Sequence, residues 1–249
     1  AAIIFSDILM LPYGLNQKVK FEKNFGPILG EFNLNEVLDL KEEDFIKKVY
    51  PIYNLINLVK NNHLTNNKST IGFVGAPWTL LVYMINKKSP KQNLRADFYN
   101  NGSLINQIMK LLDKFLKVHI KKQVENGAQI IQIFDSWAGL LNDKDLPNYV
   151  YKPTSSLVEY IKSLDVPVIC FPRGIKKYKD FCETVKPSVI CIDYEVDPVK
   201  ILNDVKIPIQ GGMDPKILLS DKNNLKKEAT RYLDIFKNHP YIFNLGHGV

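Results

Sequence analysis

Seven short apolar runs recur along the chain, and each of them ends near a Gly, Pro, Asp or Ser. They lie at residues 1–7, 70–77, 129–136, 167–174, 188–195, 207–212 and 241–248. Most are continuously apolar and do not alternate with polar positions. This pattern is typical of parallel strands that are covered on both faces. The sequence therefore predicts seven parallel strands.

Longer amphipathic stretches separate these runs. The clearest lies between Leu104 and Asn126, where Ile105, Ile108 and Leu112 recur at helical spacing and an Asn-Gly pair ends the pattern. Further helices are predicted at residues 34–60, 77–86, 155–163, 176–185, 198–203 and 224–238. Strands and helices thus alternate along the chain, which implies right-handed crossovers and an α/β fold built on a parallel sheet.

Two architectures fit this alternation: a (β/α)8 TIM-type barrel and a doubly wound open sheet. The sequence has no GxGxxG after an early strand and no GxxxxGK[ST], which are the usual phosphate-binding motifs of open sheets. We therefore favour the barrel. It is expected to be incomplete at both ends, because the chain begins inside a strand-like run and stops after a Gly-His-Gly turn. No linker or repeat divides the chain, so residues 1–249 are predicted to form one domain.

Composition narrows the class of protein further. With 45% hydrophobic residues, the chain can bury a large core, and no apolar stretch is long enough for a membrane span. The net charge of +7 favours acidic partners, but the lysines are dispersed and no basic run contains interleaved aromatic residues. We expect a small polyanionic ligand and no nucleic acid. The three cysteines lack CxxC spacing, which fits buried thiols in a reducing cytoplasm.

Polar residues at the carboxyl ends of the strands are the candidates for chemistry, because a barrel places its active site there. Three positions stand out: Asp7, Ser136 together with Asp135, and His247 between two glycines. Each also has a plain structural interpretation. Asp7 fits a capping residue, Ser136 fits a strand-end hydroxyl bonded to backbone, and His247 fits a turn residue. The other histidines, His63, His119 and His239, are expected to be solvated, and no HExxH or similar ligand spacing indicates a metal.

The densest motif is GFVGAPWTLLVYMI at residues 72–85. Pro77 fits the first position of a helix, and Tyr83 lies one turn after Thr79 on the same face. The aromatic residues of this motif are either core or the wall of a site. In the second case the Tyr83 hydroxyl faces a ligand, since buried tyrosine hydroxyls need partners.

These motifs resemble the uroporphyrinogen decarboxylase family of haem biosynthesis, in a bacterial form. The similarity covers all 249 residues and is carried by FSDIL at 5–9, GFVGAPWTL at 72–80, QIFDSWAG at 132–139, FPRG at 171–174 and NLGHG at 244–248. It implies decarboxylation of the four acetate groups of uroporphyrinogen III to coproporphyrinogen III. It also implies a usually dimeric (β/α)8 barrel that uses no metal or organic cofactor.

The resemblance also implies residue roles. Asp7 becomes the carboxylate that accepts the pyrrole N–H groups at the centre of the macrocycle. Tyr83, Ser136 and His247 become further substrate-contacting positions, and Phe73 and Phe134 become apolar walls. An ionised Asp7 is expected to stabilise a cationic, ring-protonated pyrrole, which is the electron sink for the departing CO2.

One departure from the family is clear. The arginine-bearing RQAGRY-like motif of the family has no match here, and of Arg95, Arg173 and Arg231 only Arg173 follows a strand. The chain is therefore expected to be a central piece of the enzyme and inactive by itself. Two alternatives remain open. One is a zinc-dependent methyltransferase that transfers methyl groups between a corrinoid protein and a thiol, and the other is a non-catalytic tetrapyrrole-binding relic.

Overall fold

The fold is built on a curled parallel sheet with helices on its outer side. The computed structural model describes residues 1–4, 6–23, 26–91, 93–95 and 98–248. The sheet has seven strands in the order β1-β4-β5-β6-β7-β8-β9, and every pairing in it is parallel. The strands are β1 (Ala2–Ile3), β4 (Thr70–Gly75), β5 (Ile130–Asp135), β6 (Val168–Pro172), β7 (Val189–Ile192), β8 (Ile209–Gly211) and β9 (Tyr241–Ile242).

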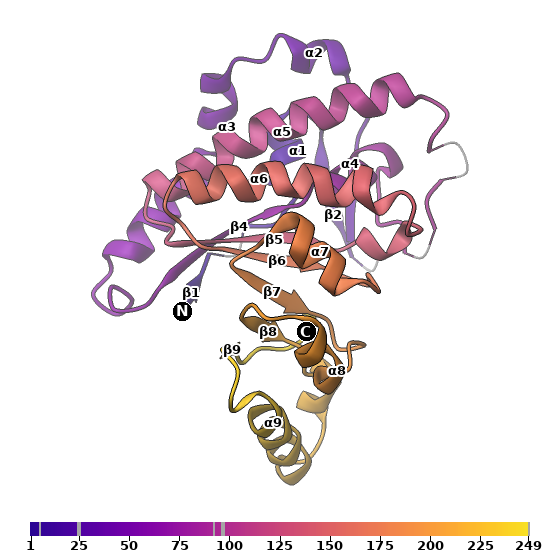
Figure 1. Cartoon of the computed structure of the whole chain (residues 1–249). Helices are drawn as coiled ribbons and strands as arrows, with labels where there is room; N and C mark the ends of the chain where they lie inside the picture. Colours follow the sequence, from indigo (N-terminus) through magenta and orange to yellow (C-terminus); the bar gives the residue numbers. More distant parts are fainter. Residues whose placement is uncertain (5, 24–25, 92, 96–97, 249) are drawn as a thin grey trace.

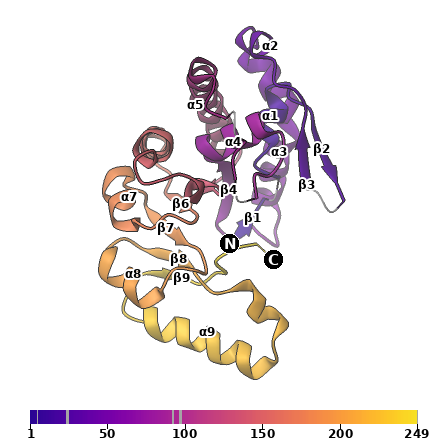
Figure 2. The ribbon, with the colours of Figure 1, turned by 90° about the vertical axis from the view of Figure 1, so that its right-hand side faces the viewer.

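Each of the seven strands lies inside one of the apolar runs that predicted it. Neighbours in the sheet follow one another along the chain apart from the insertion between β1 and β4, as in a barrel built from successive βα units. The barrel-type α/β fold predicted from the sequence is confirmed. Among the described residues β1 and β9 are the two edges of the sheet and do not pair with each other. Figure 2 shows both termini on the side of the curl between these edges.

Apart from α1, which was not predicted, the helices follow the predicted ranges closely. They are α1 (Met10–Gly14), α2 (Leu34–Leu38), α3 (Glu42–Asn61), α4 (Pro77–Asn86), α5 (Gly102–Glu125), α6 (Lys152–Ser163), α7 (Tyr178–Val185), α8 (Pro198–Asp204) and α9 (Lys222–Phe236). The predicted helix at 34–60 is in fact two helices, because α2 ends at Leu38 and α3 begins at Glu42. None of the helices in the described ranges carries an apolar stretch that would span a bilayer.

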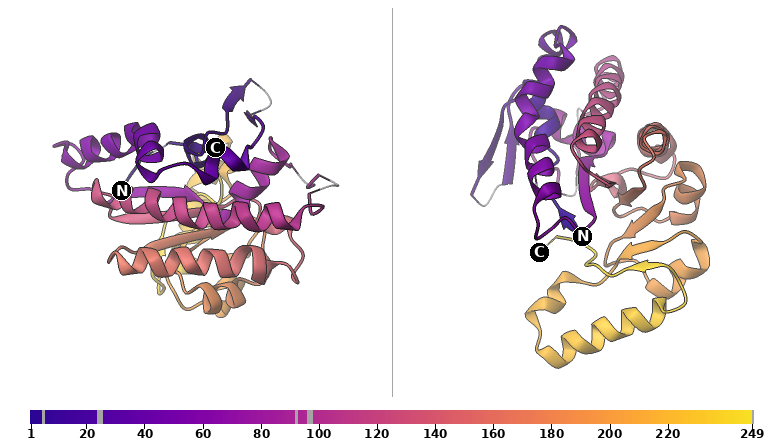
Figure 3. Two further views of the ribbon diagram at one scale, coloured as in Figure 1. Left: turned by 90° about the horizontal axis from the view of Figure 1, so that it is seen from above. Right: turned by 90° about the vertical axis from the view of Figure 1, so that its left-hand side faces the viewer.

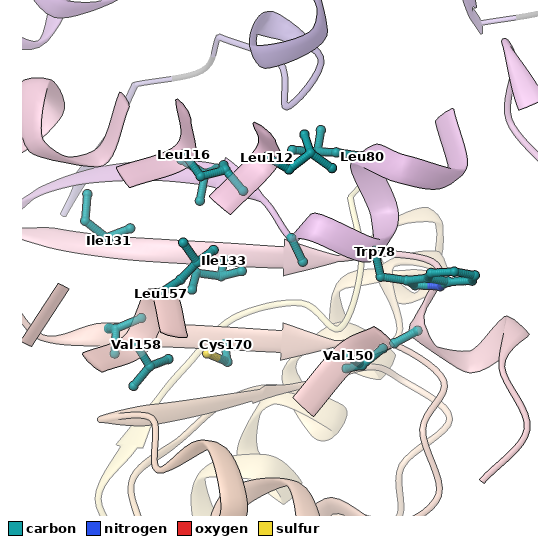
Figure 4. Packing of buried hydrophobic residues seen from close by; sticks show 14 of the residues in the cluster. Trp78, Leu80, Leu112, Leu116, Ile131, Ile133, Val150, Leu157, Val158 and Cys170 are labelled. Carbon is teal, nitrogen blue, oxygen red and sulfur yellow. The ribbon is translucent and has the colours of Figure 1, made fainter. Parts of the chain in front are cut away.

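Two distinct layers of side chains fill the molecule. In the larger layer, Ile131 and Ile133 of β5 face Leu112 and Leu116 of α5, as Figure 4 shows. Side chains alternate along a strand, so the intervening positions of β5 face the concave side of the sheet. Figure 1 and the right-hand panel of Figure 3 show α5, α6, α7 and α9 on the outside of the curled sheet.

Several elements had no signal in the apolar pattern. An antiparallel hairpin of β2 (Val19–Glu22) and β3 (Gly26–Leu29) follows α1, and most of its residues are exposed or half-exposed. The short 3-10 helices η1 (Ala138–Leu140) and η3 (Pro215–Leu219) and the π-helix η2 (Pro147–Tyr151) were also not predicted. The hairpin buries little apolar surface, and the helical turns are only 3 to 5 residues long, so none of these elements leaves a periodicity in the sequence.

His119 is not solvated, contrary to the expectation from its helical context. It lies in α5, is 4% exposed, and its Nδ1 lies 2.8 Å from the Tyr53 hydroxyl of α3. Burial lowers the pKa of His119 from 6.5 to about 4, because desolvation disfavours the imidazolium. His63 is exposed, as expected, and His239 is half-buried with its Nε2 2.9 Å from the Ile207 carbonyl.

Neutral His119 makes the fold sensitive to acid. In the unfolded chain the His119 imidazole is protonated as the pH falls below 6.5, whereas in the folded chain it is protonated only near pH 4. The free energy of unfolding therefore falls by about 2 kcal/mol between pH 7.5 and pH 5 through this group alone. Urea unfolding of the wild type and of His119→Gln, which keeps a polar partner for Tyr53, measures this contribution as a difference. Equal pH slopes for the two proteins would contradict it.

Candidate active site

The carboxyl ends of the parallel strands meet at one end of the sheet, which we call the mouth. Asp7 follows β1, Ser136 follows β5, Arg173 follows β6 and His247 follows β9. Parallel pairing places all these positions at the same end. A barrel of this type carries its chemistry there.

Asp7 has an unusual backbone and a partly free carboxylate. Its φ of 70° lies in the left-handed region, which aspartate tolerates better than most residues. Its Oδ1 accepts a hydrogen bond of 2.7 Å from the backbone N–H of Leu9. Asp7 thus closes the turn that leads into α1, whereas the N-cap position of that helix is Leu9. Oδ2 accepts none from any residue that the structure describes. Burial raises the pKa of Asp7, and the Leu9 N–H partly opposes that rise.

Tyr83 lies on α4, close to Asp7. Burial raises the pKa of its phenol, and the negative charge of Asp7 adds to the rise. The rings of Tyr83 and Trp137 meet edge to face with centroids 6.1 Å apart. The Trp137 indole N–H acts in the opposite direction on the phenol pKa, although it makes no hydrogen bond of normal geometry within the described chain.

Ser136 lines an open hollow of about 480 Å³ between the loops that follow β5 and β6. Its other lining residues are Lys91, Trp137, Gly139, Leu140, Arg173, Gly174 and Glu195. The two loops touch through glycines, because a Cβ on Gly139 would stand 2.8 Å from the Gly174 carbonyl oxygen. Asp7, Tyr83 and His247 do not line this hollow.

Arg173 is held by its backbone and leaves its side chain available. Its N–H donates to the Asp135 carbonyl at 3.1 Å, and its own carbonyl accepts from the Gly139 N–H at 2.9 Å. The residue is half-buried, and within the described part of the chain its guanidinium has no acidic partner in an ion pair. A guanidinium of this kind suits a carboxylate ligand.

Phe73 and Phe134 form part of an aromatic wall on the concave side of the sheet. Their rings meet edge to face with centroids 5.5 Å apart. Phe171 of β6 extends the row, with its ring 6.0 Å from that of Phe134. This row has apolar neighbours in Ile169 and Cys191. Phe171 was not among the sequence candidates, although its alternation with Cys170 along β6 places it on this face.

His247 is at the mouth but is exposed, and its Nδ1 lies 3.0 Å from the carbonyl of the next residue. Its turn is pinned by the Gly246 N–H, which donates to the Met213 carbonyl at 2.7 Å. A side chain on Gly246 would collide with the backbone of Tyr194. Among the described residues, no hydrogen bond, ion pair or ring contact joins His247 to Asp7, Tyr83 or Ser136.

The structure thus brings some of the candidates together and leaves one apart. Asp7 and Tyr83 interact, Ser136 and Tyr83 are linked through Trp137, and Phe73 packs on Phe134. The arrangement offers a carboxylate, a phenol and an apolar wall around one mouth, with cationic side chains at its rim. In the described ranges, no three His, Cys, Asp or Glu side chains are grouped as metal ligands.

Comparison with known proteins identifies the family. The family model described as uroporphyrinogen decarboxylase matches residues 1–249. Uroporphyrinogen decarboxylase of Rickettsia bellii is 37% identical over 100% of this chain and 75% of its own length. That of Wolbachia pipientis is 40% identical over 100% of this chain and 74% of its own.

Among solved structures, a methyltransferase from Methanosarcina mazei has a TM-score of 0.78 over 100% of this chain and 74% of its own. Its sequence identity is only 12%, so this likeness concerns the fold. The family match over the whole chain and the curated relatives agree with the motifs at the strand ends. The chain belongs to the uroporphyrinogen decarboxylase family.

Proposed function

We propose that this protein removes the carboxyl groups from the four acetate side chains of uroporphyrinogen III and releases coproporphyrinogen III, as a carboxy-lyase of haem biosynthesis. Membership of the family supports the activity. The observation that carries the proposal in this chain is the half-buried Asp7. One of its oxygens is free of hydrogen bonds from the described residues, and it interacts with Tyr83 at the mouth.

The chemistry of the substrate matches the chemistry of the mouth. The macrocycle has an apolar body, inward-facing pyrrole N–H donors and carboxylates around its edge. Phe73, Phe134 and Phe171 supply an apolar surface for the body. Asp7 supplies an acceptor for the N–H groups, and the net charge of +7 favours a polyanion.

The reaction needs an electron sink, which the substrate itself provides. A proton adds to a ring carbon of the pyrrole, and the ring becomes cationic. The bond between the acetate CH2 and its carboxylate then breaks, CO2 leaves, and the bonding electrons neutralise the ring. A proton adds to the resulting exocyclic carbon and the ring proton is lost, so each acetate becomes a methyl group with net uptake of one proton. The proposed chemistry uses no metal or organic cofactor.

Asp7 acts in this scheme through its charge. A fixed anion next to the ring favours the cationic intermediate over the neutral substrate, and a low-dielectric surrounding strengthens the effect. Burial works against ionisation of Asp7, as its raised pKa indicates. Pyrrole N–H donors from the bound substrate offset that penalty, so the carboxylate is best stabilised when the substrate is in place.

Arg173, Lys91 and Ser136 are proposed to hold substrate carboxylates at the rim. They line the same hollow of about 480 Å³, which is large enough for an acetate or propionate group. Tyr83 and His247 complete the set of substrate contacts. Tyr83 would make its contact from α4, and the exposed His247 from the turn that follows β9.

We further propose that residues 1–249 form one domain of a cytoplasmic protein that is a homodimer when full length and has no nucleic-acid partner. The sheet pairs without a break from β1 to β9, the three cysteines are free thiols, and the positive charge is dispersed. Sedimentation equilibrium measures the assembly directly, and a monomer at micromolar concentration would exclude the dimer.

The direct test of the function is an assay on the protein expressed with its complete natural sequence. Uroporphyrinogen III is supplied under reducing conditions, and the products are oxidised and separated by their number of carboxyl groups. We expect successive seven-, six-, five- and four-carboxyl species. Unchanged substrate from a folded enzyme would refute the proposal.

The substitution Asp7→Asn tests the electrostatic role of this residue. Asparagine has the same shape and also tolerates a positive φ, so the fold should persist, while turnover should fall by roughly a hundred-fold or more. Asp165→Asn is the matched control, since Asp165 also has a positive φ of 58° and is exposed away from the mouth. Rates within about two-fold of wild type for Asp7→Asn would remove the residue from the mechanism.

Arg173→Gln tests recognition of substrate carboxylates. Loss of a charge-assisted hydrogen bond of about 1.5–3 kcal/mol should raise KM by about 10- to 100-fold with a smaller change in kcat. Arg231→Gln is the control, because Arg231 pairs with Glu228 on the outer helix α9. If both variants keep the wild-type KM, Arg173 does not bind the substrate.

A further inference from the structure

A network of buried hydrogen bonds joins the start of α4 to the turn that follows β5. The Thr79 hydroxyl donates to Asp135 Oδ1 at 2.6 Å and accepts from the Trp137 backbone N–H at 3.1 Å. On the other side, the Trp78 indole Nε1 donates to the Trp137 carbonyl at 2.9 Å. The Trp137 backbone is thus held on both sides by residues at the start of α4.

Asp135 is an unexpected residue to find in this hydrogen-bond network. It is 3% exposed, and its Oδ2 is buried with no hydrogen-bond partner in the described structure. Burial raises the pKa of Asp135 to about 7, although the hydroxyl and backbone N–H of Thr79 both oppose the rise. A polar group left half-satisfied in the interior is destabilising, so some other advantage must keep it there.

The direction of the side chain excludes direct contact with a ligand in the mouth. Asp135 has the same parity along β5 as Ile131 and Ile133, which face the helix layer in Figure 4. Its partner Thr79 lies in that layer, and Thr79 is also fully buried. Asp135 therefore acts on the mouth only through the residues to which it is connected.

Those residues are two of the candidates for substrate contact. Ser136 lies between Asp135 and Trp137, so fixing both neighbours fixes its backbone. Tyr83 is one turn after Thr79 on α4, and its ring meets that of Trp137 edge to face. The network therefore connects the backbone on both sides of Ser136 to the helix that carries Tyr83.

We propose that Asp135 and Thr79 are positioning residues, which lock the Ser136–Trp137 turn to α4 so that Ser136 and Tyr83 meet the substrate in a fixed relation. The proposal rests on the proposed function for its kinetic consequence. Its structural content, a rigid Trp137 held by Thr79, is independent of the reaction.

Paired substitutions separate positioning from a general effect on the core. Thr79→Val and Asp135→Ala remove the central hydrogen bond, whereas Thr79→Ser and Asp135→Asn keep a donor and an acceptor. We expect the first pair to lower kcat/KM by roughly 10- to 100-fold, as small misplacements do, and the second pair to stay within about three-fold of wild type. Thr154→Val is the matched control, because the Thr154 hydroxyl is also buried in a helix but has no described partner.

Tryptophan fluorescence supplies a readout that does not depend on catalysis. The protein has two tryptophans, Trp78 and Trp137, and both belong to the network. Thr79→Val and Asp135→Ala should shift the emission to longer wavelength and increase quenching by acrylamide. Thr79→Ser, Asp135→Asn and Thr154→Val should leave both properties unchanged.

The outcomes decide between the possibilities. Wild-type spectra and rates in Thr79→Val and Asp135→Ala would overturn the proposal, as would equal losses in Thr154→Val or in Asp135→Asn. If the disruptive variants do not fold, hydrogen exchange of the Trp137 amide is measured in the wild type. Exchange as slow as that of the β5 amides supports a turn fixed to α4, and exchange as fast as that of exposed loops overturns the proposal. A wild type that folds but does not decarboxylate contradicts the proposed function, while the spectra and exchange still test the lock.

Discussion

The parallel pairing of β4, β5 and β6 is the constraint on which the site depends. Each ladder fixes where the next strand ends, so Gly75 arrives beside Phe134 and Asp135 beside Pro172 at one mouth. The loops that leave these ends have little freedom. The Ala76 N–H donates to the Phe134 carbonyl, and the Arg173 N–H donates to the Asp135 carbonyl, so strand pairing continues into the turns. The mouth is therefore an extension of the sheet.

Two carboxyl groups near this end illustrate opposite uses of burial. Asp7 keeps one oxygen free of described partners at the mouth, while Asp135 is enclosed between the sheet and α4. Both have raised pKa values because of desolvation. The first is placed where a ligand with N–H donors can complete its shell, and the second is bound to the protein's own hydroxyl. Position on the strand end, inward or outward, decides which role a carboxyl group can take.

Much of this structure could be predicted from the sequence, for physical reasons that differ between elements. The strands were recognisable because parallel strands are buried on both faces, and α4 because Pro77 suits a helix start. The exposed hairpin at 19–29 left no such pattern. His119 lies on the apolar face of α5 at helical spacing from Leu112 and Leu116, so the local pattern could have predicted its burial. Its partner Tyr53 is 66 residues away, and no local pattern identifies that contact. Strand alternation predicts that Phe171 faces the concave side and that Asp135 faces the helices. The contact between the loops after β5 and β6 could not be predicted, because it depends on the three-dimensional fold.

The contact between Gly139 and Gly174 has a consequence for variation of the mouth. The two backbones are in direct contact at this point, so no side chain can be added at Gly139 without separating the two loops. A side chain at Gly139 would have to displace the backbone of Gly174, and both glycines line the hollow that Ser136 and Arg173 also line. Two residues without side chains thus determine how closely the loops after β5 and β6 approach each other, and with it the width of that hollow.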